Sequence, residues 1–246
     1  PSTIRRMKLV EADRVVIVGA EALTHLTWHN CHSRFPSCPK LKTLNYTLPE
    51  DTTEETWDEL DGLTSLTALT YPDFNDEMSG IPRNVVDLSI DVFLETTDLS
   101  GLGHLTRLTA LHLEATGESE SAFLPELTPL QLLDAPDIRF DSFPVSLRTC
   151  LMYVETKANL SDLTCLERLS VKCETRARLI LPTQLAVLEL FRSFPVCNIS
   201  KVHLRTFFCH LDNELSPSER SQLPPSIETC IIEQPWSSYA RKNSGY

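Results

Sequence analysis

The sequence lacks long apolar runs and contains little glycine, with 7 Gly among its 246 residues. The longest aliphatic candidate, Val15 to Val18, falls far short of the ~20 residues that a membrane-spanning helix requires. No glycine-rich phosphate loop, nucleophile elbow or His-Glu-x-x-His motif occurs. We therefore expect no membrane insertion, and no motif indicates catalysis or a bound cofactor.

Basic residues are scarce relative to acidic ones. The chain has 22 Lys and Arg against 34 Asp and Glu, which gives a formal net charge of -12. Nucleic acids and anionic membranes attract basic surfaces, so neither is expected to be the principal partner. Pairs of acidic residues are abundant but scattered along the chain, and they do not indicate a catalytic centre.

The cysteines include no Cys-x-x-Cys pair, although the chain has 8 of them. Isolated cysteines favour reduced, structural thiols and a cytoplasmic protein. The alternative is a secreted or cell-surface protein with disulfides. Three Asn-x-Ser/Thr triplets, at Asn45, Asn159 and Asn198, are compatible with that alternative because such triplets accept N-linked glycans.

The densest group of potential metal ligands is His25, His29, Cys31, His32 and Cys38. Zinc needs about four converging nitrogen or sulfur ligands. In an extended strand, the first two histidines point to one face, while Cys31 falls in the turn that follows. We therefore interpret the histidines as solvated strand residues and predict no metal site.

What the sequence does contain is a recurring Leu-x-x-Leu-x-Leu core, in which other apolar residues and Cys substitute for Leu. The clearest copy is Leu108, Leu111 and Leu113. The first apolar positions of twelve copies are Ile4, Leu23, Leu41, Leu66, Val85, Leu108, Leu130, Leu147, Leu166, Leu185, Leu204 and Ile227. A spacing near 20 residues is typical of repeat proteins, whose units stack because each is too small to bury its own apolar side.

The repeats resemble those of the leucine-rich-repeat family over essentially the whole chain. The usual Asn or Cys in the turn after the strand is present only at Cys31, so the repeats are divergent. The resemblance implies a right-handed α/β solenoid with about twelve short parallel strands on a concave face and short helices or irregular turns on the convex face. We expect the solenoid over residues 1–233, a cap or tail over 234–246, and further repeats upstream of Pro1.

Two kinds of segment lead into the expected strands. One kind has proline shortly before the strand, as at Pro82, Pro144, Pro182 and Pro224, and proline predicts a tight turn. The other kind has a polar cap followed by an aliphatic residue, at Asp98-Leu99, Asn159-Leu160 and Asn198-Ile199. Capping boxes at Thr52 to Glu55 and Ser216 to Glu219 predict two short helices.

Function is expected on the outward positions of the strands, which lie two, four and six residues beyond the first apolar position of each copy. Large apolar residues at such positions indicate an interaction surface. The expected partner-binding residues are Leu132, Leu151, Tyr153, Arg168, Lys172, Val187, Phe191, Phe208 and Ile231, with acidic neighbours Asp87, Asp91, Glu114 and Asp134. Tyr153 and Phe191 share one row of this face, and Leu151, Phe208 and Ile231 share the next.

The sequence therefore predicts a non-catalytic module that binds a protein partner on its concave face. Two alternatives remain open: a substrate-recognition arm of a larger enzyme, such as a ubiquitin ligase, and an architectural subunit of a large assembly. The identity of the partner and the oligomeric state cannot be deduced from these residues.

Overall fold

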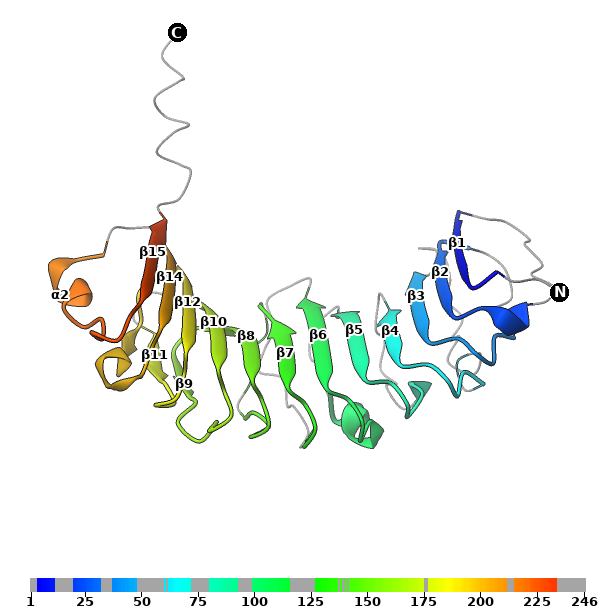
Figure 1. Ribbon diagram of the computed structural model, residues 1–246, viewed down its shortest axis with the longest axis horizontal. Coiled ribbons are helices and arrows are strands. Elements are labelled where there is room, and N and C mark those ends of the chain that lie inside the picture. The colour runs from blue at the N-terminus through cyan, green and yellow to red at the C-terminus, as the bar shows by residue number, and fades with distance from the viewer. Residues whose placement is uncertain are drawn as a thin grey trace, which may run out of the picture. The chain divides into compact units, whose positions relative to one another are not determined.

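The computed structural model describes residues 4–11, 20–31, 37–47, 60, 62–71, 80–92, 99–115, 127–136, 138, 140, 142–174, 177–211 and 215–233. The chain divides into two compact units, residues 1–130 and 131–246. Both units are built of short parallel strands joined by turns and a few short helices (Figure 1). Within the described ranges, no helix is both long and apolar enough to cross a membrane.

The first unit contains six strands that pair in sequence order. They are β1 (Arg6–Val10), β2 (His25–His29), β3 (Thr43–Thr47), β4 (Ala68–Tyr71), β5 (Asp87–Val92) and β6 (Ala110–Ala115). Two short 3-10 helices precede strands of this unit, η1 (Ala20–Ala22) before β2 and η3 (Leu99–His104) before β6. A short 3-10 helix thus leads into the strand that carries Leu111.

The second unit contains six strands in one series and three in another. The first series, paired in this order, is β7 (Leu132–Ala135), β8 (Thr149–Val154), β10 (Arg168–Cys173), β12 (Val187–Arg192), β14 (Thr206–Leu211) and β15 (Thr229–Glu233). The other series is a small parallel sheet of β13 (Val196–Cys197), β11 (Arg178–Ile180) and β9 (Lys157–Asn159). Two short helices, η4 (Ile199–Lys201) and α2 (Pro217–Arg220), complete the unit.

Every predicted strand is present, and each begins two residues after the first apolar position of its copy. Paired strands align equivalent positions, so that Arg168 lies opposite both Thr149 and Val187. Alternate residues face opposite sides: Leu169 and Val171 are fully buried, whereas Arg168 is exposed. The prediction of about twelve short parallel strands is therefore confirmed, including its register.

A common turn delivers the chain into the strands. Where proline precedes the strand, the backbone N–H of the first apolar position donates a hydrogen bond to the proline carbonyl. An example is the Val85 N–H, which donates to the Pro82 carbonyl at 3.0 Å. Where leucine takes that place, the same turn forms, with the Leu66 N–H donating to the Leu63 carbonyl at 2.9 Å. The tight turn predicted for the proline repeats is thus shared by the others.

Opposite the longer series, the second unit differs from the sequence prediction. Short helices or irregular turns were expected there, but β9, β11 and β13 form a sheet whose inner residues Ala158 and Leu179 are buried. These strands arise because consecutive repeats of nearly equal length place their return segments side by side. Backbone hydrogen bonds then satisfy groups that would otherwise be left unpaired.

The predicted helix caps have mixed outcomes. Ser216 and Glu219 form the expected capping box on α2. Asn198 precedes η4, but its side chain makes no cap; its amide instead accepts from the Leu181 N–H at 2.8 Å and donates to the Leu181 carbonyl at 3.1 Å. The amide reaches the neighbouring turn, which offers both a donor and an acceptor. Asp98, the box at residues 52–55 and the tail 234–246 lie outside the described residues.

Candidate functional site

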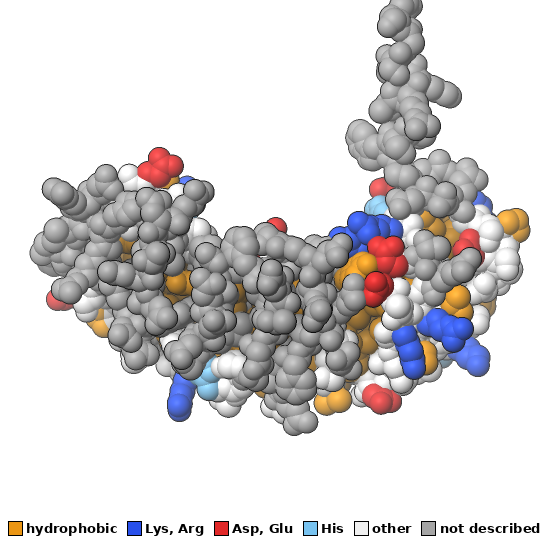
Figure 2. All heavy atoms as spheres, turned by 180° about the vertical axis from the view of Figure 1, so that it is seen from behind, with side chains coloured by type: hydrophobic (Ala, Val, Ile, Leu, Met, Phe, Trp, Pro, Cys, Tyr) orange, Lys and Arg blue, Asp and Glu red, His pale blue; other side chains and the backbone are white. Residues whose placement is uncertain are grey.

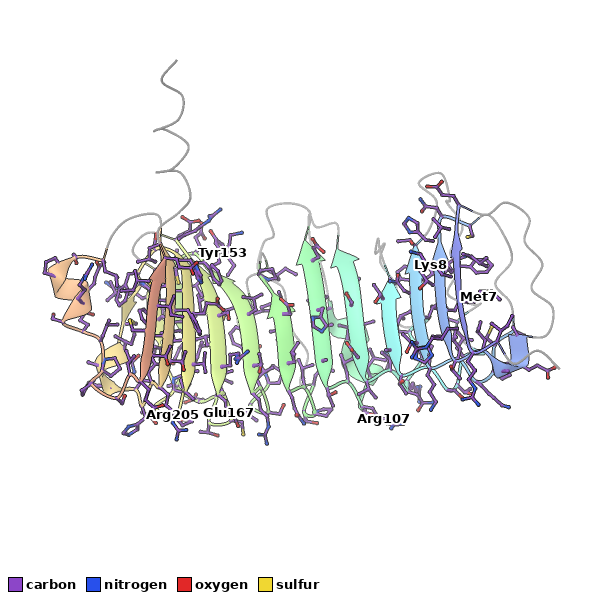
Figure 3. The ribbon with its side chains drawn as sticks, turned by 45° about the horizontal axis from the view of Figure 1, so that its top comes forward. Met7, Lys8, Arg107, Tyr153, Glu167 and Arg205 are labelled. Atoms are coloured by element: carbon purple, nitrogen blue, oxygen red, sulfur yellow. The ribbon has the colours of Figure 1, made fainter. Side chains whose placement is uncertain are left out.

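The outward face of the second unit consists of three rows of side chains that run across the strands. The first row is Leu132, Thr149, Arg168, Val187, Thr206 and Thr229. The second row is Asp134, Leu151, Ser170, Glu189, Phe208 and Ile231. The third row is Tyr153, Lys172, Phe191, His210 and Glu233. Tyr153 lies near the ends of the strands, whereas Glu167 and Arg205 lie where the strands begin (Figure 3).

The structure places the expected apolar residues in the expected rows but does not make them continuous. Lys172 separates Tyr153 from Phe191 in the third row. In the second row, Ser170 and Glu189 stand between Leu151 and Phe208. Most of these aromatic and aliphatic side chains are half-buried. The outward face is therefore a set of apolar groups around a polar centre rather than one apolar patch.

The polar centre is a chain of four polar side chains joined by one hydrogen bond and two close contacts between histidine and glutamate. The Ser170 hydroxyl donates to Glu189 Oε2 at 2.8 Å, and His210 Nε2 lies 3.4 Å from Glu189 Oε1. The other imidazole nitrogen, Nδ1, lies 3.2 Å from Glu233 Oε2. The Glu189 and His210 side chains are each 31% exposed, so the carboxylate is held in place yet accessible from solvent.

Aromatic stacking and a second polar arm border this centre. The Phe191 and His210 rings stack with centroids 5.0 Å apart and an interplanar angle of 10°. Near the ends of the strands, Glu174 Oε1 accepts a hydrogen bond from the Tyr153 hydroxyl at 3.1 Å and pairs with Arg192 Nη1 at 2.7 Å. Arg192 has a φ of 70°, a left-handed conformation that costs energy for a residue other than glycine.

The contacts of the centre do not form a Ser-His pair or a set of metal ligands. Ser170 donates to the carboxylate of Glu189, whose other oxygen faces His210, so the hydroxyl does not hydrogen-bond to the imidazole. The two glutamates contact different nitrogens of His210, and one metal ion binds an imidazole through a single nitrogen. Across the described residues, no group of three or more His, Cys, Asp or Glu is placed to hold a metal ion.

The acidic residues expected near the site are divided between the units. Asp87 and Glu114 are exposed on the outward face of the first unit, where Asp87 Oδ1 lies 3.7 Å from His112 Nε2. Asp91 belongs to β5, but its side chain lies outside the described part of the structure. Asp134 lies on the second unit. Each set is therefore a feature of its own unit.

His25 and His29 lie on strand β2, as expected, but they are half-buried and contact local partners, while His32 lies outside the described residues. The rings of His29 and His25 contact the hydroxyls of Thr47 and Thr24, respectively. Cys31 is buried, and its Sγ donates to the His29 carbonyl at 3.3 Å. Cys31 thus takes the turn position that the leucine-rich-repeat pattern assigns to Asn or Cys.

Sequence reasoning missed the polar centre of the outward face. It searched the outward positions for large apolar residues and therefore passed over Ser170, Glu189, His210 and Glu233. A signal was present, because these four residues occupy outward positions in four successive repeats. A comparison of the polar residues at outward positions of neighbouring copies would have identified this group.

The strand register decides the type of fold. Within each unit, every repeat contributes one strand, equivalent positions align across neighbouring strands, and the Leu-x-x-Leu-x-Leu residues of the interior repeats are buried. These features are those of a repeat solenoid, and they agree with the leucine-rich-repeat resemblance of the sequence.

Two solved structures are similar to this chain. An internalin from Listeria monocytogenes is 14% identical with a TM-score of 0.47, and the match covers 87% of this chain and 68% of that chain. The circular leucine-rich-repeat protein CroV588 is 13% identical with a TM-score of 0.44. That match covers 92% of this chain but only 42% of CroV588. No protein-family model and no characterised protein matches the sequence.

Proposed function

We propose that this leucine-rich-repeat chain is a non-catalytic module that binds a protein partner on the outward face of its second unit. The observation that carries the proposal is the set of half-buried aromatic and aliphatic side chains on adjacent strands, chiefly Val187, Phe191 and Phe208. Aromatic residues on a solvated face supply large contact areas and are frequent carriers of binding energy.

The sheet supports this role because it fixes the positions of these side chains. Neighbouring parallel strands are about 4.8 Å apart, and their backbones are hydrogen-bonded on both sides in β10, β12 and β14. A partner that docks on such a face loses less conformational entropy than one that must order a loop. Arg168, exposed in the first row, would meet an acidic group of the partner.

The test is affinity capture from native extract with the wild-type chain and the Phe191→Ser/Phe208→Ser variant. We expect proteins enriched by the wild type to be lost from the variant, because both substitutions remove apolar contact area. The matched control is Val145→Ser/Val196→Ser. These valines are each 64% exposed on the second unit but belong to none of the three rows.

Figure 2 shows exposed hydrophobic side chains close to Lys and Arg side chains on the second unit, seen from behind. The control is expected to capture the same proteins as the wild type. If the valine variant loses the captured proteins while the correctly folded phenylalanine variant keeps them, the binding surface lies elsewhere.

A further inference from the structure

We propose that the partner places a cationic side chain, arginine or lysine, on the carboxylate of Glu189 between Phe191 and Phe208. This inference rests on the proposed function and specifies the chemistry of the partner. It makes the polar centre of the outward face a receptor for one basic residue of a protein segment.

The surroundings of Glu189 suit such a residue. Phe208 lies directly opposite Glu189 on β14, while Val187 and Phe191 flank it on the same face of β12. The carboxylate is therefore bordered by apolar groups on three sides. The hydrocarbon stem of arginine or lysine packs on such groups, and an aromatic ring attracts the cation itself.

One hydrogen bond and one close imidazole contact hold the carboxylate in one orientation. Oε2 accepts from the Ser170 hydroxyl, and Oε1 faces Nε2 of His210. The His210 ring is itself stacked on Phe191. Each carboxylate oxygen can accept two hydrogen bonds, so each keeps a free lone pair. The side chain remains 31% exposed. A donor from outside therefore has access to a preorganised acceptor.

The cost of covering Glu189 explains why the incoming group should be cationic. Any partner that contacts both Phe191 and Phe208 also removes water from the carboxylate between them. Burying a carboxylate without a counter-charge costs several kcal/mol, and a bonded cation offsets this cost. The net charge of -12 also favours a basic segment of the partner, because long-range attraction steers it to the chain.

The experiment pans a random-peptide display library on the immobilised full-length chain, in parallel with the Phe191→Ser/Phe208→Ser variant. Peptides that require the phenylalanines are expected to share an arginine or lysine beside apolar residues. For one such peptide, Glu189→Gln should weaken binding about ten- to hundredfold, because a charge-assisted hydrogen bond is lost.

Two controls isolate the contact between the cation and Glu189. Glu228→Gln removes the same charge from an exposed position just before β15 and should leave the affinity unchanged. Replacing the basic residue of the peptide by norleucine should weaken binding to the wild type but have little further effect on Glu189→Gln. Circular dichroism verifies that each variant is folded.

The outcomes separate the two proposals. If no selected peptide depends on the phenylalanines, the proposed binding face is wrong, and the inference falls with it. If selected peptides depend on the phenylalanines but share no basic residue, or bind Glu189→Gln as tightly as the wild type, the binding face stands and the inference alone is overturned.

Discussion

Cysteine side chains in this chain differ widely in their access to solvent. Cys150 and Cys209 are buried in the core, whereas Cys165 and Cys230 are exposed, and all are free thiols. Burial raises the pKa of Cys150 to about 12, with a smaller contribution from the charge of Asp134. It also raises the pKa of Cys209 to about 12. Since the thiolate is the reactive form, the buried thiols are doubly protected at neutral pH.

This difference predicts the order in which the thiols are alkylated. In the native protein at neutral pH, maleimide should label Cys165 and Cys230 first, and peptide mass spectrometry reads the order. Cys150 and Cys209 should react only after denaturation. Labelling of Cys150 at the rate of Cys165 would contradict its burial. Disulfides in protein isolated without reductant would count against the reducing compartment that we expect.

Cys230 also shows how position in the array changes the environment of a residue. Cys150, Cys209 and Cys230 all occupy inward motif positions, where the repeat pattern leads us to expect buried thiols. The third is exposed because β15 is the last strand that the structure describes, and no described repeat follows to cover it. The motif predicts the direction of a side chain, while its burial depends on the neighbouring repeat.

At the scale of elements, the Asn198 side chain adds to the backbone pairing between two return segments of the second unit. Asn198 makes two hydrogen bonds to the backbone of Leu181, one as acceptor and one as donor. Leu181 is buried, so removal of the amide leaves two backbone groups with poor access to water. An unsatisfied buried polar group costs about 1–3 kcal/mol.

We therefore expect Asn198→Ala to lower the free energy of unfolding by about 1–3 kcal/mol, measured by urea denaturation. Asn159→Ala is the matched control. Asn159 is exposed, and its side chain accepts one hydrogen bond, from the Ser161 N–H at 3.2 Å. Asn159→Ala should lower the free energy of unfolding by clearly less than Asn198→Ala does. Equal losses in the two variants would show that the amide of Asn198 contributes no more than a surface turn.

The sequence was sufficient to place the longer series of strands but not the smaller sheet. Strands such as β10 alternate apolar and polar residues over six positions, a pattern that distinguishes buried from exposed faces. The strand β9 has three residues, Lys157 to Asn159, and only Ala158 points to the core. One small apolar residue carries no recognisable period, so pairing with β11 depends on the stacking of repeats.

At the scale of the whole molecule, the candidate site exists only because repeats stack. Ser170, Glu189, His210 and Glu233 come from four successive repeats, and parallel pairing brings them together. The rows were predictable from the register, since equivalent positions align. The contacts between these side chains were not predictable, because they depend on side-chain conformations that the motif does not specify.

The central claim is that the outward face of the second unit binds a protein partner. The most direct measurement is hydroxyl-radical footprinting by mass spectrometry, with and without a captured partner. In the free chain, Tyr153 and Phe208 should be oxidised far more than Phe207, which is fully buried. On binding, oxidation of Tyr153, Phe191 and Phe208 should fall, whereas oxidation of Val145 and Val196 should not change. Protection of the two valines with unchanged oxidation of the aromatic residues would contradict this claim.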